Sequence, residues 1–297
     1  MVNPNFFIVG APKAGTSALS EYLRKNPEVF ISKPKEPHYF ADDLPRMKSV
    51  SSLDEYLAMF DPAKPVQKAV GEASVWYLFS NQALINIKAF DPSAKIIIML
   101  RNPVDLAYSL HAQMLVTTDE DLPNFADAWH MQHERANGHS IPRNCREPAI
   151  LQYRYTCQLG KQVERALAIF PKNQIYICCF EDFISDTGRI YEEVCNFLGV
   201  SPASPPEFKV VNPNTSYRSR GIANFVERPS DFFSGKILGI KTSHLRKIIR
   251  YLNTKTVPRP PMDNDLREEL VDYFREDVQL LARIIDRDLS SWIITRA

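Results

Sequence analysis

The stretch that decides the fold is Phe6-Phe-Ile-Val-Gly-Ala-Pro-Lys-Ala-Gly-Thr-Ser17. Its first four residues form a short apolar run, which is typical of a strand buried on both faces of a parallel sheet. The apolar spacing that follows predicts a helix over residues 17–24. At a glycine-containing turn between a strand and a helix, the first N–H groups of the helix are unpaired and the positive end of the helix dipole faces the turn. The sequence therefore predicts an anion site, most simply for a phosphate, between Gly10 and Ser17.

The position of the lysine distinguishes this turn from the phosphate loop of ATP- and GTP-hydrolysing proteins. Gly10 and Gly15 have the G-x4-G spacing of that loop. In such a loop a lysine follows the second glycine directly, whereas this chain has Thr16 there and Lys13 inside the turn. The displaced lysine favours a metal-free transfer reaction over a reaction on magnesium-bound ATP. The alternative interpretation is a plain structural turn between a strand and a helix.

A second predicted strand, residues 95–100, also ends in polar residues. Arg101 follows it directly, and Ser109 lies eight residues later, about two helical turns on. Ligands of open α/β sheets bind beyond the carboxyl ends of the strands. Arg101 is therefore a candidate for a forked contact to a phosphate, and Ser109 for a hydroxyl contact. The alternatives are a surface ion pair for Arg101 and a hydrogen bond from Ser109 to its own helix.

Predicted strands and helices alternate along the chain, which indicates βαβ units and a parallel sheet. We expect an α/β, P-loop-like three-layer fold with a central, mostly parallel β-sheet flanked by helices, and one domain over residues 1–297. Strands are expected at residues 6–9, 29–31, 68–72, 95–100 and 174–180, and helices at 17–24, 53–60, 81–90, 104–114, 124–135, 151–170, 189–198, 245–252 and 266–286.

Composition and charge exclude several classes of protein. A net charge of +1 over 297 residues gives no global field for binding nucleic acid. The first residues lack the basic start and apolar segment of a signal peptide, and the five cysteines form no CxxC pair, so we expect a reducing cytoplasm.

His130 and His133 are spaced for one helix face, but only His139 or Cys145 lie near as a third ligand, so no metal site is expected.

Taken together, the motifs resemble those of a known enzyme family. Pro12-Lys-Ala-Gly-Thr-Ser17 resembles the 5′-phosphosulfate loop of the sulfotransferases that use 3′-phosphoadenosine 5′-phosphosulfate (PAPS), and Arg101-Asn-Pro-Val-Asp105 followed by Ser109 resembles their 3′-phosphate site. Lys35-Glu-Pro-His-Tyr-Phe40 is similar to a segment of the heparan-type members. The bacterial branch is resembled in Tyr155-x-x-Gln-Leu159, in Phe180-Glu-Asp182 and from Tyr273 to Trp292. The resemblance implies PAPS as the sulfuryl donor. It implies cofactor contacts from Lys13, Ala14, Gly15, Thr16, Ser17, Arg101, Ser109, Arg218 and Arg220.

The resemblance also implies catalytic roles. Lys13 is expected to stabilise the leaving phosphate, as a compact charge can. Glu36 matches the family's catalytic glutamate and is the expected general base. His38 is the alternative base, because cytosolic members use a histidine. From the residues alone, an exposed Glu36 paired with Lys33 or Lys35 is the simpler interpretation, and His38 is then a hydrogen-bonded core residue.

Glu72, Tyr77 and His111 are the candidate acceptor-binding residues. Glu72 and Tyr77 belong to Gly71-Glu-Ala-Ser-Val-Trp-Tyr77, which is similar to a Glu-Lys-x-Pro-x-Tyr segment of the heparan-type members. Glu72 can serve as a second acid or a hydrogen-bond acceptor, or as a structural partner of Arg101 or Lys13. This chain has Ala73 where those relatives have a lysine, which argues against a heparan-like acceptor.

The predicted function is sulfuryl transfer from PAPS to a hydroxyl or amine of a small-molecule, carbohydrate or glycolipid acceptor, without nucleic acid. One alternative is a P-loop nucleotide kinase or NTPase, which would bind magnesium-bound ATP. Another is a non-enzymatic binder of nucleotides or membranes. Residues 236–259 are basic and include the predicted amphipathic helix 245–252, so we expect at most peripheral membrane contact. A packed helix with a solvated basic face is the commoner interpretation.

Overall fold

A computed structural model describes residues 2–202 and 260–294, and the backbone of four short strands among the residues between them. Those strands pair as two antiparallel ribbons, β6 (Thr215–Tyr217) with β9 (Thr254–Thr256) and β7 (Lys236–Ile237) with β8 (Ile240–Lys241). The predictions for Arg218, Arg220 and a helix at residues 245–252 lie outside the described residues.

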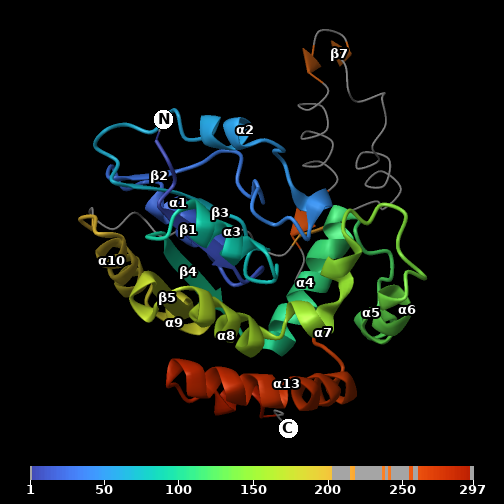
Figure 1. Ribbon diagram of the computed structural model, residues 1–297. Helices are drawn as coiled ribbons and strands as arrows, with labels where there is room; N and C mark the ends of the chain where they lie inside the picture. The colour runs from blue at the N-terminus through green and yellow to red at the C-terminus, as the bar shows by residue number, and fades with distance from the viewer. Residues whose placement is uncertain are drawn as a thin grey trace.

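A five-stranded parallel sheet forms the centre of the molecule (Figure 1). Its order is β2-β3-β1-β4-β5, with β1 (Phe6–Gly10) in the middle, β3 (Ala69–Ala73) and β4 (Lys95–Leu100) beside it, and β2 (Val29–Ile31) and β5 (Ile175–Cys179) at the edges. In register, Phe6 lies opposite Gly71. A Cβ atom at Gly71 would lie 2.2 Å from the carbonyl oxygen of Phe6, so only glycine allows these strands to pair here.

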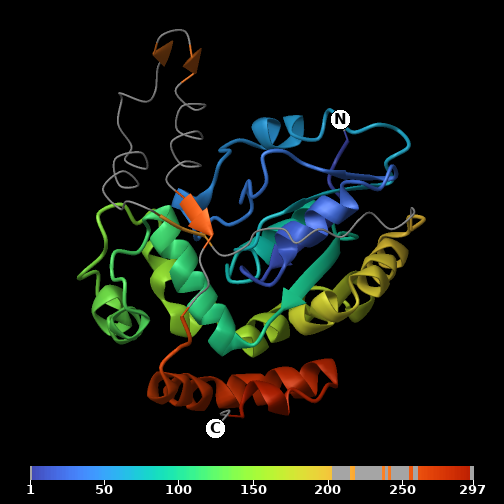
Figure 2. The ribbon, with the colours of Figure 1, turned by 180° about the vertical axis from the view of Figure 1, so that it is seen from behind.

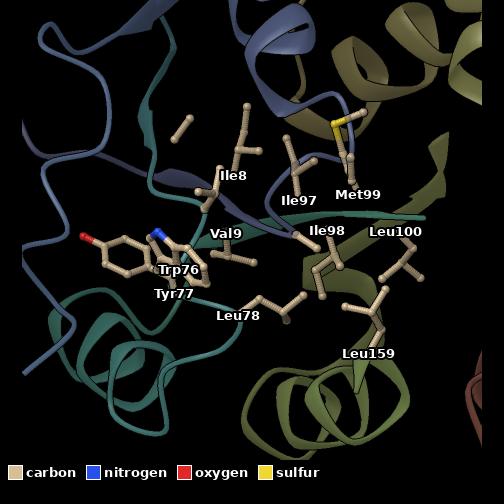
Figure 3. Close-up of a cluster of buried hydrophobic side chains, with 14 of the residues drawn as sticks. Ile8, Val9, Trp76, Tyr77, Leu78, Ile97, Ile98, Met99, Leu100 and Leu159 are labelled. Atoms are coloured by element: carbon tan, nitrogen blue, oxygen red, sulfur yellow. The ribbon is translucent and has the colours of Figure 1, made fainter. Parts of the chain in front are cut away.

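Helices cover both faces of the sheet, which confirms the predicted three-layer α/β class. One face carries α1 (Thr16–Leu23), α9 (Phe180–Ser185) and α10 (Thr187–Leu198), and the other carries α3 (Ala83–Phe90) and α8 (Leu159–Ile169). The side chains of β4 alternate between the two layers, as Figure 3 shows: Ile97 and Met99 point to one side of the strand, and Ile98 and Leu100 to the other. In both ribbon views α13 (Asn264–Ile285) runs outside α8 (Figures 1 and 2).

The predicted single helix over residues 151–170 is wrong. The structure has η2 (Pro148–Leu151), α7 (Tyr153–Thr156) and α8 there. The break is imposed by α13, because the Asp277 carboxylate accepts hydrogen bonds from the backbone N–H of Gly160 (2.8 Å) and Lys161 (3.0 Å) and so caps the start of α8. Gly160 permits this contact, since a Cβ atom there would lie 2.3 Å from the Asp277 carbonyl oxygen.

The remaining elements follow local capping signals. Ser52 and Glu55 form a capping box at the start of α2 (Leu53–Ala58), and Asn102 caps α4 (Pro103–Thr117). The predicted helix at 124–135 is divided into two, and the predicted strand at 174–180 gives way to α9 at Phe180.

No described helix is both long and apolar enough to cross a bilayer. The further elements are α5 (Phe125–His130), α6 (Gln132–Ala136), η1 (Pro45–Met47), η3 (Lys172–Gln174) and η5 (Ser290–Trp292).

Candidate active site

The parallel sheet brings the two predicted phosphate motifs to one edge. Because β1 and β4 pair in parallel, their carboxyl ends meet, and the turn after Gly10 lies beside Arg101. The Arg101 guanidinium donates a hydrogen bond from Nη1 to the carbonyl oxygen of Lys13 (3.0 Å). The two motifs, 88 residues apart in the chain, are therefore in direct contact.

Residues 10–17, called the phosphate loop below, present a helix start that no side chain caps. Gly15 is the N-cap of α1 with a φ of 92°, and it has no side-chain capping hydrogen bond. The N–H groups of the first helical turn, at Thr16 and Ser17, have no partner within the helix. A Cβ atom at Gly15 would lie 3.2 Å from side-chain atoms of Met99, Phe180 and Phe183. Glycine therefore suits this position twice, because it tolerates the positive φ and leaves room for these three side chains. This geometry suits an anion.

Two cationic side chains stand at the same edge. The Lys13 ammonium donates to the Gln113 amide oxygen (3.1 Å), and the Arg101 guanidinium lies over the Phe180 ring (4.7 Å to its centroid). Burial lowers the pKa of Arg101, while Asp105 and Glu181 raise it; arginine stays charged in proteins. Ser109 is buried in α4. Gln113 was missed by sequence reasoning, although it lies one helical turn after Ser109.

Residues 35–40, called the acceptor segment below, approach the phosphate loop through Lys35. The Lys35 ammonium donates to the Ser17 hydroxyl (2.8 Å) and lies 3.0 Å from the Glu36 carboxylate. The Glu36 side chain is 36% exposed, and its contact with Lys35 places it near Ser17 at the start of α1. The sequence identified Lys35 only as a charge partner of Glu36, and its bridge to Ser17 depends on the tertiary fold.

His38, in contrast, is almost completely enclosed. Its side chain packs edge-on against Tyr77, and its Nε2 atom is buried without a hydrogen-bond partner among the described residues. Burial lowers the pKa of His38 to about 4, and the charges of Arg146 and Lys35 act in the same direction, whereas Glu36 opposes them. The imidazole is therefore neutral at pH 7.

Glu72 and Tyr77 lie in the interior behind the acceptor segment. The Glu72 carboxylate accepts hydrogen bonds from the hydroxyls of Tyr56 (2.9 Å), Tyr77 (2.8 Å) and Ser74. Burial raises the pKa of Glu72 to about 7; the three hydroxyl hydrogen bonds oppose this shift, and the charge of Glu36 adds to it. Ser74 and Tyr56 were not singled out from the sequence.

His111 is buried in α4, with its Nε2 atom 2.9 Å from the Leu122 carbonyl oxygen. Acceptor binding by Glu72, Tyr77 and His111 stays a prediction. Within residues 2–202 and 260–294, no three His, Cys, Asp or Glu side chains are grouped to hold a metal ion. Arg218 and Arg220 lie outside the described residues.

Comparison with known proteins shows the family of the chain. The sulfotransferase domain family matches residues 3–219. The chain belongs to the sulfotransferase family. A sulfotransferase from Alicyclobacillus acidocaldarius, known from its crystal structure, is 30% identical, with a TM-score of 0.74 and coverage of 98% of this chain and 99% of that one. The predicted family and fold class are thereby confirmed.

Two mouse proteins show the family relationship in sequence. Carbohydrate sulfotransferase 15 of Mus musculus is 25% identical over 311 residues, which cover 85% of this chain and 52% of that protein. Bifunctional heparan sulfate N-deacetylase/N-sulfotransferase 4 of Mus musculus is 25% identical over 303 residues, with coverage of 98% and 31%. The chain thus spans about half or less of the length of these relatives.

Proposed function

We propose that this sulfotransferase moves the sulfuryl group of PAPS to a hydroxyl or amine of an acceptor. One observation carries the proposal: the phosphate loop, Arg101 and the Lys35–Glu36 pair converge at one edge of the sheet. An uncapped helix start and two cations fit a donor with two separate phosphates, because each phosphate finds its own positive group.

Each residue has a distinct role in this proposal. When bound, PAPS supplies a sulfuryl group that leaves its 5′-phosphate oxygen for the acceptor oxygen or nitrogen. Lys13 neutralises the negative charge that remains on the phosphate, and the start of α1 holds that phosphate. Arg101 and Ser109 hold the 3′-phosphate, with Arg218 and Arg220 as further contacts. Glu36 takes the proton that the acceptor loses.

Glu36 is favoured over His38 as the base for a physical reason. The Glu36 carboxylate is partly exposed and stands beside Ser17 through Lys35, so an acceptor can reach it. His38 is enclosed, and its lowered pKa makes it a weak base at neutral pH.

A carbohydrate acceptor is proposed from the relatives, one of which is named a carbohydrate sulfotransferase. A transfer assay with labelled PAPS and a panel of sugar, glycolipid and small-molecule acceptors tests this class. Labelling of a non-sugar acceptor with none of the sugars would contradict it.

Calorimetry tests the donor directly. We expect 3′-phosphoadenosine 5′-phosphate to bind more tightly than ATP with magnesium, because Lys13 is not placed for a magnesium-bound triphosphate. Tighter binding of ATP would overturn the proposal in favour of a nucleotide kinase or NTPase.

The base is tested with Glu36→Gln. We expect the turnover number to fall by ~10²–10⁴-fold, the usual contribution of a general base, with unchanged affinity for 3′-phosphoadenosine 5′-phosphate. Glu164→Gln, an exposed carboxylate on α8, is the matched control and should keep full activity. If Glu36→Gln also keeps full activity, the base is His38, and His38→Gln should then lose it.

A further inference from the structure

Glu72 is a fully buried carboxylate whose hydrogen bonds all come from neutral hydroxyl groups. Glu120, another buried carboxylate, illustrates the usual solution, because it pairs with the Arg135 guanidinium (2.6 Å). Burying a carboxylate is costly, and the three hydroxyls offset that cost only in part. Packing of β3 alone does not account for a buried carboxylate with no cationic partner among the described residues, so the contacts of its hydroxyl partners matter.

Two of these hydroxyls connect Glu72 to the acceptor segment. The Ser74 hydroxyl accepts a hydrogen bond from the backbone N–H of His38 (3.0 Å), and the Tyr77 hydroxyl accepts one from that of Phe40 (3.3 Å). A hydroxyl has a single proton, so donating it to Glu72 directs its lone pairs toward the backbone. Glu72 thus orients the two acceptors that hold the segment.

The acceptor segment needs such support because its backbone is strained. Glu36 and His38 have φ angles of 65° and 51°, in the left-handed region that non-glycine residues rarely adopt. Pro37, which lies between them, is held by a separate contact: its carbonyl oxygen accepts a hydrogen bond from the Ser49 N–H (2.9 Å). Loss of the two hydroxyl contacts removes two of the hydrogen bonds that hold this backbone, beside those to the Pro37 carbonyl oxygen from Ser49 and to the Phe40 carbonyl oxygen from Asn86.

We infer that Glu72 is a positioning residue, which acts through the hydroxyls of Ser74 and Tyr77 to hold the strained acceptor segment and so places the Glu36 carboxylate beside the phosphate loop. The expected effect on turnover rests on the proposed function. The expected effect on the order of the acceptor segment is independent of that function.

The positioning is strongest with an ionised Glu72, because a protonated or amide side chain becomes a donor at one end and there no longer accepts the proton of Ser74. The titratable groups around it are Glu36 and His38 from the acceptor segment, Tyr56 from α2, and Tyr77. Burial raises the pKa of both tyrosines well above their usual range, and His38 stays neutral above about pH 4, so these three groups do not change charge near pH 7. Glu72, with a pKa of about 7, does.

The main test is Glu72→Gln. We expect the turnover number to fall by about 10–100-fold, the range for a misplaced catalytic group, with the affinity for 3′-phosphoadenosine 5′-phosphate unchanged. The decline of turnover below about pH 7 in the wild-type protein should disappear in the variant. Hydrogen exchange at the His38 amide should accelerate, and that at Phe40 should accelerate less, because the amide oxygen of glutamine can still accept from Tyr77, while exchange at Thr16 and Ser17 should stay the same.

A pair of tyrosine variants provides the matched control. Tyr56 and Tyr77 both donate to Glu72, but only Tyr77 also accepts from the acceptor segment. Tyr77→Phe should therefore lower turnover and accelerate amide exchange at Phe40 more than Tyr56→Phe does. Because both changes remove one hydroxyl from the same carboxylate, equal effects would overturn the inference and leave Glu72 a purely structural group.

The outcomes separate the two proposals. A wild-type protein that neither binds 3′-phosphoadenosine 5′-phosphate nor transfers sulfuryl groups contradicts the proposed function, whatever the exchange data show. An active wild-type protein with a folded Glu72→Gln variant of normal turnover, pH profile and amide exchange overturns the positioning role alone. If Glu72→Gln does not fold, the tyrosine pair decides.

Discussion

The phosphate loop and the acceptor segment are held in place by different means. The phosphate loop follows the central strand β1, and glycine geometry, backbone N–H groups and one contact from Arg101 define it. The acceptor segment follows the edge strand β2, and side-chain hydroxyls that lead back to Glu72 support it. The proposed phosphate site therefore depends on the backbone of one short stretch, whereas the proposed base depends on side chains from several elements.

The largest expected effect on the phosphate loop comes from Lys13→Ala. We expect the turnover number to fall by about 10²–10³-fold, the usual loss when one charge-stabilising group is removed. Affinity for 3′-phosphoadenosine 5′-phosphate should change much less, because the backbone still holds the phosphate. Steady-state kinetics and calorimetry measure the two quantities. Lys172→Ala, at the exposed start of η3, is the control; a loss confined to affinity would contradict the role of Lys13.

Gly15→Ala probes the same loop through its backbone. A side chain at a φ of 92° adds strain of about 1–2 kcal/mol, to which close contacts with Met99, Phe180 and Phe183 add. Gly138→Ala is a matched control, since Gly138 has a φ of 80° and nothing within 4 Å of its Cβ position. Urea unfolding should show a larger loss of unfolding free energy for Gly15→Ala. Equal losses would mean that the helix start is not tightly packed.

The last expected effect is on the pH dependence of stability, and it concerns the acceptor segment and Glu72. The lowered pKa of His38, about 4 against 6.5, makes the free energy of unfolding rise as pH increases through that window. The raised pKa of Glu72, about 7 against 4.5, makes it fall as pH increases from 4.5 to 7. The two contributions oppose each other between pH 4.5 and 6.5.

In Glu72→Gln only the rising contribution remains. The slope of unfolding free energy against pH should therefore be more positive than in the wild-type protein, by at most about 1.4 kcal/mol per pH unit. Denaturant titrations at several pH values measure both slopes. Parallel curves for the two proteins would show that Glu72 does not titrate in this range.

The sequence by itself determined the strand–turn–helix of the phosphate loop, the arginine at the end of β4 and the α/β class. These features depend on short stretches: apolar runs, glycine spacing and helix capping decide them locally. The strands predicted at 29–31 and 95–100 match β2 and β4 in their residue bounds for the same reason.

The tertiary structure alone decided the break before α8, the bridge from Lys35 to Ser17 and the surroundings of Glu72. Asp277 reaches α8 from more than a hundred residues away, and Tyr56 reaches Glu72 from another element. Such contacts depend on how elements pack, and packing leaves no local pattern in the chain. The proposed anion site therefore rests on one stretch, whereas the support of the proposed base could be recognised only once β3, α2 and the acceptor segment were together.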